Sequence, residues 1–70
     1  MNKFEIEKCL EELNEKNCTA FWIIKKDGNH QGGYMSELIN NVDNECIQLK
    51  QKEIYYTAYY TDIANLMYTY

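Results

Sequence analysis

The dipeptide Asp27-Gly28 constrains the fold of this chain more than any other feature. It joins an apolar, β-prone run, Thr19–Lys26, to a second extended run that contains Gly32 and Gly33. A tight turn between two such runs needs positive φ angles, which glycine adopts without steric cost. Glycines within the second run favour a sharp bend, as in small barrels that curl a sheet on itself. We therefore expect a bent β-hairpin within a small closed or nearly closed barrel.

An amphipathic helix is predicted ahead of the hairpin, over residues 3–16. Asn2 is a suitable N-cap, and Glu5 completes a capping-box pattern with it. Asn17 can end the helix in the left-handed region. Charged residues fill the exposed face, and apolar residues recur at helical spacing on the other: Phe4, Ile6, Cys9, Leu10 and Leu13.

The first strand of the hairpin carries apolar residues on both of its faces. Phe21 and Ile23 point to one side of the strand, and Trp22 and Ile24 point to the other. This pattern indicates that both faces are at least partly covered. We expect one side to face the barrel interior, and the other to face the helix or a neighbouring subunit.

The middle of the chain is predicted to continue the sheet. The second strand runs from Asn29 to about Ile39, although Ser36–Ile39 fits equally well a short helical turn capped by Ser36. Asn40–Asn44 has the composition of a loop, and a third strand follows from Cys46.

The last third of the chain is rich in tyrosine and threonine, which favour strands. We expect a fourth strand from Ile54, a turn over residues 61–64 and a fifth strand over Asn65–Tyr70. An alternative with two further helices, over residues 36–49 and 54–67, stays open. The preferred interpretation is mainly β with one N-terminal helix, and a five-stranded, strongly bent, SH3-like barrel over residues 19–70.

Length and charge limit the function of the chain. Seventy residues correspond to one domain, residues 1–70, with a small core. The net charge is −4, and the sequence contains seven lysines but no arginine. Arginine is the preferred residue for bidentate contacts with phosphate and guanine. The composition therefore argues against strong nonspecific binding of nucleic acid, although localised binding is compatible with it.

The sequence shows no signature of catalysis, of a metal site or of a cofactor site. The three cysteines form no CxxC pair and fit reduced, mostly buried thiols, while His30 is the only histidine. No nucleophile is paired with a base, and Gly32-Gly33 precedes no predicted helix. There is no signal-peptide pattern or membrane-spanning run. We expect a non-enzymatic, cytoplasmic protein without cofactor or metal.

One helix followed by five short strands resembles the Sm-like family, and within it the Hfq-like RNA chaperones. The likeness covers residues 4–68. It is carried by Leu10 and Leu13 in the helix, by the strand and turn FWIIKKDG, and by Gly33 five residues after Gly28. Tyr60-Thr61-Asp62-Ile63-Ala64 occupies the place of the family's Tyr-Lys-His-Ala-Ile segment.

The resemblance implies a ring of subunits that pair edge to edge through Tyr60 and the final strand. The family's Lys-His pair lines a central pore and contacts uridine-rich RNA. This chain has Thr61 and Asp62 at those positions, and a ring of aspartates would repel phosphate. The family's architecture is therefore expected here without its usual RNA contacts.

Two functions follow from the sequence. The first is a ring-forming, Sm-like binding module for single-stranded RNA or a protein partner. Its candidate contacts are Lys25, Lys26, Asn29, His30, Tyr60, Thr61 and Asp62, together with exposed tyrosines that stack on bases. The alternative is a small acidic protein-interaction domain, such as a phage or mobile-element inhibitor, that occupies the nucleic-acid site of a partner.

Overall fold

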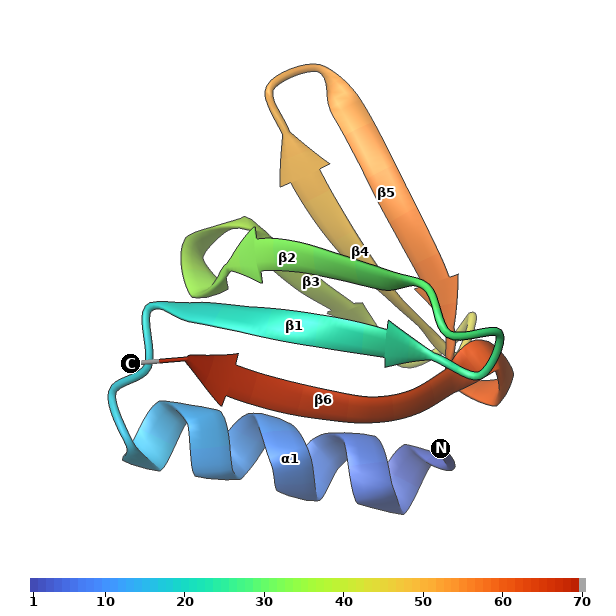
Figure 1. Cartoon of the computed structure of the whole chain (residues 1–70), viewed down its shortest axis with the longest axis horizontal. Coiled ribbons are helices and arrows are strands. Elements are labelled where there is room, and N and C mark those ends of the chain that lie inside the picture. The colour runs from blue at the N-terminus through green and yellow to red at the C-terminus, as the bar shows by residue number, and fades with distance from the viewer. Residues whose placement is uncertain (70) are drawn as a thin grey trace.

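The computed structural model describes residues 1–69, which form one α-helix and two antiparallel sheets of three strands each (Figure 1). In chain order the elements are α1 (Lys3–Glu15), β1 (Ala20–Lys25), β2 (His30–Tyr34), the 3-10 helix η1 (Met35–Glu37), β3 (Leu38–Asn41), β4 (Cys46–Gln51), β5 (Ile54–Tyr59), the 3-10 helix η2 (Tyr60–Asp62) and β6 (Ile63–Thr69). Sheet 1 has the order β2-β1-β6, and sheet 2 has the order β3-β4-β5. The fold is thus mainly β, with one N-terminal helix.

The prediction of a five-stranded, strongly bent, SH3-like barrel is wrong. Residues 1–69 contain six strands in two sheets, and neither sheet closes on itself. The strand predicted over residues 29–39 is interrupted by η1, so its two halves, β2 and β3, belong to different sheets. Glu37 stabilises this interruption because its carboxylate accepts a hydrogen bond from the Tyr34 amide at 2.9 Å.

The open choices in the middle and last thirds of the chain are also resolved. A short helical turn forms near Ser36, but it begins at Met35, and Tyr34 is its N-cap. The alternative helices over residues 36–49 and 54–67 are wrong, because these segments are mainly strands. The predicted turn over residues 61–64 corresponds to η2, which begins one residue earlier, and residues 63 and 64 belong to β6. Tyr70 of the predicted last strand lies outside the described residues.

The helix forms as the sequence predicts. The Asn2 side chain accepts a hydrogen bond from the Glu5 amide at 2.9 Å, and the Glu5 carboxylate accepts one from the Asn2 amide at 3.0 Å. This capping box satisfies two backbone donors at the start of α1. Asn17 follows the helix with a φ of 53°, in the left-handed region. Of the residues predicted on the apolar face, Ile6, Leu10 and Leu13 are buried and Cys9 is half-buried. Phe4 is 85% exposed, so its predicted place on that face is wrong.

The core lies between α1 and the inner faces of the two sheets. Phe21 and Ile23 of β1 are buried, and they belong to the same cluster as the buried residues of α1. The helix therefore packs on the Phe21 side of β1, the same side as the core. The expectation that the helix covers the opposite side of β1 from the interior is wrong. Trp22 is 41% exposed, so the outer face of sheet 1 is only partly covered.

The predicted Asp-Gly hairpin is confirmed. Gly28 has a φ of 93°, and its amide donates to the Lys25 carbonyl at 3.0 Å. The Asp27 carboxylate accepts a hydrogen bond from the Asn29 amide at 2.9 Å. This hydrogen bond is the main reason why the pKa of Asp27 lies below its usual value. The turn places β1 and β2 in the register Ala20↔Tyr34 through Ile24↔His30.

The two sheets meet at Gly33, where sheet 1 passes close to Leu49 of β4. A Cβ atom at Gly33 would lie 2.8 Å from Cδ1 of Leu49, which is shorter than real Cβ contacts. Leu49 is fully buried. The absence of a side chain at residue 33 therefore lets the two sheets pack against each other, and this role replaces the predicted bend within one long strand.

The two-residue turn between β4 and β5 is strained at Lys52, which has a φ of 60°. A positive φ costs an L-residue about 1–2 kcal/mol, and glycine removes this cost for about 0.5–1 kcal/mol of backbone entropy. We expect Lys52→Gly to raise the free energy of unfolding by about 0.5–1 kcal/mol in urea titrations. Glu53→Gly is the control, because Glu53 has no positive φ, and it should lower stability. A lower urea midpoint for Lys52→Gly would contradict the assigned strain.

Candidate functional site

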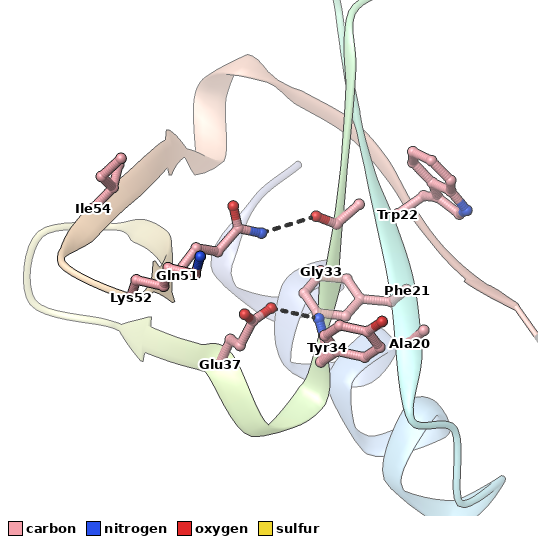
Figure 2. A pocket seen from close by; sticks show the side chains of 10 residues that line it. Ala20, Phe21, Trp22, Gly33, Tyr34, Glu37, Gln51, Lys52 and Ile54 are labelled. Carbon is pink, nitrogen blue, oxygen red and sulfur yellow. Dashed lines mark hydrogen bonds between the residues drawn. The ribbon is translucent and has the colours of Figure 1, made fainter.

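A groove of about 650 Å³ lies between β2 and the turn that joins β4 to β5 (Figure 2). One wall is formed by β2 and the adjoining part of β1, and the other by the end of β4, the turn and η1. Most of the lining is apolar, and Glu37 and Lys52 bring one charge of each sign. The groove is lined by Ala20, Phe21, Trp22, Gly32, Gly33, Tyr34, Glu37, Gln51, Lys52 and Ile54.

The two glycines of β2 shape the wall of this groove. Because neither has a side chain, Ala20, Phe21 and Trp22 of the neighbouring strand also line the groove. The Trp22 ring packs directly on the backbone of Gly32, since a Cβ there would lie 3.2 Å from the ring. The result is a narrow backbone ridge with aromatic side chains next to it.

The backbone of β2 has one edge that pairs with no other strand in residues 1–69. The Met35 amide donates to the Thr19 carbonyl at 2.8 Å, and the Lys25 amide donates to the Asn29 carbonyl at 2.8 Å. In an antiparallel ladder the backbone groups of alternate residues point to the same partner strand. The backbone groups of residues 31 and 33 therefore face β1, and those of His30, Gly32 and Tyr34 point to the free edge.

Side chains occupy part of this free edge in place of a strand. The Gly32 carbonyl accepts hydrogen bonds from the side-chain amides of Gln51, at 3.3 Å, and Gln31, at 3.0 Å. The Tyr34 amide donates to the Glu37 carboxylate (Figure 2). An amide donor and a carboxylate acceptor thus stand where the N–H and C=O groups of an additional strand would lie.

The structure brings together three of the residues predicted as a site. Lys25, Lys26 and Asp62 line a small hollow at the hairpin end with Asp27, and the Lys26 amide donates to the Asp62 carbonyl at 2.9 Å. Two lysines and two aspartates give this hollow no net charge. The cluster is therefore not a basic patch of the kind that attracts phosphate.

Of the other predicted site residues, Tyr60 and Thr61 line a second hollow with Lys26 beside the start of α1, whereas Asn29 and His30 line neither hollow. Asn29 belongs to the hairpin turn, and His30 is exposed, with its ring 6.1 Å from that of Trp22 in an edge-on arrangement. Thr61 is exposed in η2. Tyr60 is only 2% exposed, and its hydroxyl donates a hydrogen bond to the Asn40 side chain. Burial raises the pKa of Tyr60, which packs in the core.

Sequence reasoning missed the groove. Gly32, Gln51, Lys52 and Ile54 are not among the predicted contacts, and Tyr34 is included only through the general expectation of exposed tyrosines. The signal available in the sequence was an isoleucine directly after the polar Gln51-Lys52-Glu53 segment, where Ile54 proves to be 72% exposed. An exposed large apolar residue beside a turn is a common mark of an interaction surface.

Within residues 1–69, no three His, Cys, Asp or Glu side chains gather so as to hold a metal ion. Cys9, Cys18 and Cys46 are free thiols, and burial is the main cause of a raised pKa at Cys9. In the same part of the chain, α1 is too short and too polar to cross a membrane.

Comparisons with protein families, with characterised proteins and with solved structures find no match to this chain. The resemblance to Sm-like and Hfq-like proteins therefore stays a prediction, and the groove itself is the basis for a functional proposal.

Proposed function

We propose that this protein is a non-enzymatic binding module that takes an extended segment of a protein partner into the groove beside β2. The observation that supports this most strongly is the free edge of β2. On this edge the Gly32 carbonyl accepts a hydrogen bond from the Gln51 side chain, and the Tyr34 amide donates one to the Glu37 side chain. Extended peptides bind such edges by adding a strand, with main-chain hydrogen bonds for affinity and adjacent pockets for specificity.

Binding would exchange the side-chain hydrogen bonds for main-chain ones. A peptide N–H replaces the Gln51 amide at the Gly32 carbonyl, and a peptide C=O replaces the Glu37 carboxylate at the Tyr34 amide. Because side chains alternate along a strand, every second side chain of the partner would enter the groove. Tyr34 and Ile54, which are 61% and 72% exposed, supply apolar surface for those side chains.

The charges favour a protein partner over RNA. The lysines at the hairpin end lie beside Asp27 and Asp62, and the groove carries one charge of each sign. The chain as a whole has a net charge of −4. A phosphate backbone gains little from such a surface, and the RNA contacts predicted from the sequence become an outcome of the test.

The test begins with a displayed library of random peptides, selected on the purified chain. We expect selected peptides to alternate apolar and polar residues and to lose about tenfold in affinity against Ile54→Ser, from the lost apolar burial. Phe4→Ser is the matched control, because Phe4 is 85% exposed on α1, outside the groove, and this change should leave affinity unaltered. Amide NMR should show the Gln51 side-chain signal shifting on binding.

Three results would contradict the proposal. One is the failure of selection to yield any peptide sensitive to Ile54→Ser. Another is saturable binding of short oligouridine or oligoadenosine at micromolar protein, reduced by Lys25→Ala, which would restore the RNA prediction. The third is peptide affinity that falls steeply with salt. That result would favour the alternative in which an acidic surface, rather than the groove, meets the partner.

A further inference from the structure

Strand β5 is the outer strand of sheet 2, and within residues 1–69 only β4 pairs with it. In Figure 1 its outer edge faces away from the rest of the molecule, at the far side of the sheet from β3. The register with β4 runs without interruption from Cys46↔Tyr59 to Gln51↔Ile54. β5 therefore offers a regular edge, six residues long, for another strand.

The backbone groups on this edge can be identified. The Tyr60 amide donates to the Glu45 carbonyl at 2.8 Å, one residue beyond the first registered pair. Alternation along an antiparallel ladder then directs the groups of Ile54, Tyr56 and Ala58 toward β4. The amides and carbonyls of Tyr55, Thr57 and Tyr59 consequently point to the outer edge.

Nothing in β5 protects this edge against pairing. Proteins usually guard exposed edges with lysine, proline, a bulge or a very short strand. The sequence of β5, IYYTAY, contains no charged residue and no proline. The other edges differ. Side chains occupy part of the β2 edge, β3 has only four residues, and α1 lies along β6 (Figure 1).

The three outward-facing residues are arranged symmetrically about Thr57. Tyr55 and Tyr59 are 55% and 54% exposed, and Thr57 lies half-buried between them. An antiparallel copy of the same strand, related by a two-fold axis at Thr57, would place each Tyr55 opposite Tyr59 of the second copy. Cross-strand aromatic pairs of this kind stabilise antiparallel sheets.

We propose that two copies of this chain associate through β5 in an isologous, antiparallel pair centred on Thr57. The two copies of sheet 2 then form one continuous sheet across the two-fold axis. The occupant is a second copy because the pattern Tyr55, Thr57, Tyr59 is self-complementary, and no like charges face each other along the uncharged strand pair. Of the β5 residues, only Ile54 also lines the peptide groove, and Tyr55, Thr57 and Tyr59 do not.

The affinity of the pair should be modest. One strand pair with two tyrosine pairs is smaller than a standard interface of about 1,600 Å². We therefore expect a monomer–dimer equilibrium with a dissociation constant in the micromolar range. The mass should rise with concentration from that of the 8.4 kDa chain to twice that value and no further.

Sedimentation equilibrium of the full chain tests this proposal, with Thr57→Lys as the disrupting variant. Two lysines facing each other across the two-fold axis repel, so dimerisation should weaken at least about tenfold. Gln48→Lys is the matched control. Gln48 pairs with Thr57 on the adjacent strand, so it adds the same charge to the sheet one strand away from the edge. That variant should dimerise like the unaltered chain.

Hydrogen exchange of the unaltered chain provides a second measurement that does not depend on any variant. The amides of Tyr55, Thr57 and Tyr59 should become protected as the protein concentration rises, because only these β5 amides point to the outer edge. Three results would overturn the proposal: a monomer at all concentrations up to millimolar, assemblies larger than a dimer, or equal effects of Thr57→Lys and Gln48→Lys.

Discussion

Leu49→Ala is expected to leave a large fraction of the protein unfolded in the absence of denaturant. Leu49 is fully buried where sheet 1 meets sheet 2, and its methyl groups fill the space above Gly33. Removal of a buried leucine side chain costs about 2–5 kcal/mol. A core of this size rarely supplies more than about 3–5 kcal/mol of stability. Urea titration followed by circular dichroism should show a folded baseline that is short or absent.

A double-mutant cycle tests whether the Gly33 contact is the reason. Gly33→Ala alone should cost about 1–3 kcal/mol, because its Cβ would meet both methyl groups of Leu49. Leu49→Val removes that obstruction and leaves the protein stable enough for its free energy of unfolding to be measured. In this background the methyl group that Gly33→Ala adds should cost much less. The coupling should reach about 1 kcal/mol.

The control for this cycle is Gly28→Ala. It introduces strain at a φ of 93°, but nothing lies within 4 Å of its Cβ, so its cost should be the same in both backgrounds. Additive effects of Gly33→Ala and Leu49→Val would contradict the close approach of the two sheets at Gly33.

Phe21→Ala should lower the stability about as much as Leu49→Ala does, whereas Trp22→Ala, at the next residue, should lower it far less. Phe21 is 1% exposed on the inner face of β1, and truncation of a buried phenylalanine costs about 3–5 kcal/mol. Trp22 is 41% exposed on the outer face, so Trp22→Ala should cost no more than about 1 kcal/mol. Urea midpoints by circular dichroism compare the two variants without relying on the tryptophan signal.

The variants Phe21→Ala and Trp22→Ala also test how far the outer face of β1 is covered. The sequence predicts that both faces of the strand are at least partly covered, since apolar residues point to both. The structure covers the Phe21 face with the core and leaves Trp22 on an outer surface. Equal losses of stability from the two substitutions would show that the outer face is buried in solution.

The features that the sequence predicts well are those set by near neighbours. The capping box of Asn2 and Glu5 and the hairpin at Asp27-Gly28 each depend on residues within one turn. In both cases the residue type favours one backbone conformation by local hydrogen bonding or by access to positive φ. The tertiary contacts of the fold are compatible with both of these local conformations.

The break between β2 and β3 could not be located in this way. The glycines at 32 and 33 predict a bend within one strand, but the interruption begins at Met35. Gly33 is required by Leu49, sixteen positions further along the chain. A contact of that separation leaves no local pattern, because nothing near Gly33 in the sequence identifies its neighbour in space.

The candidate groove was missed for the same reason. Its walls come from β1 and β2 on one side and from the β4–β5 turn on the other, so no short motif contains it. The hollow at the hairpin end is easier to predict from the sequence, since two of its residues, Lys25 and Lys26, are adjacent in the chain. Even there, the partner charge of Asp62 follows only from the pairing of β1 with β6.

The placement of β1 between β2 and β6 has a consequence for synthesis on the ribosome. One neighbour of β1 follows it directly, but the other, β6, is made some forty residues later. Sheet 1 therefore stays incomplete while most of the chain is being translated, and Phe21 and Ile23 remain accessible to chaperones during that time. Folding should be a late, nearly all-or-none event that awaits the emergence of Ile63–Thr69.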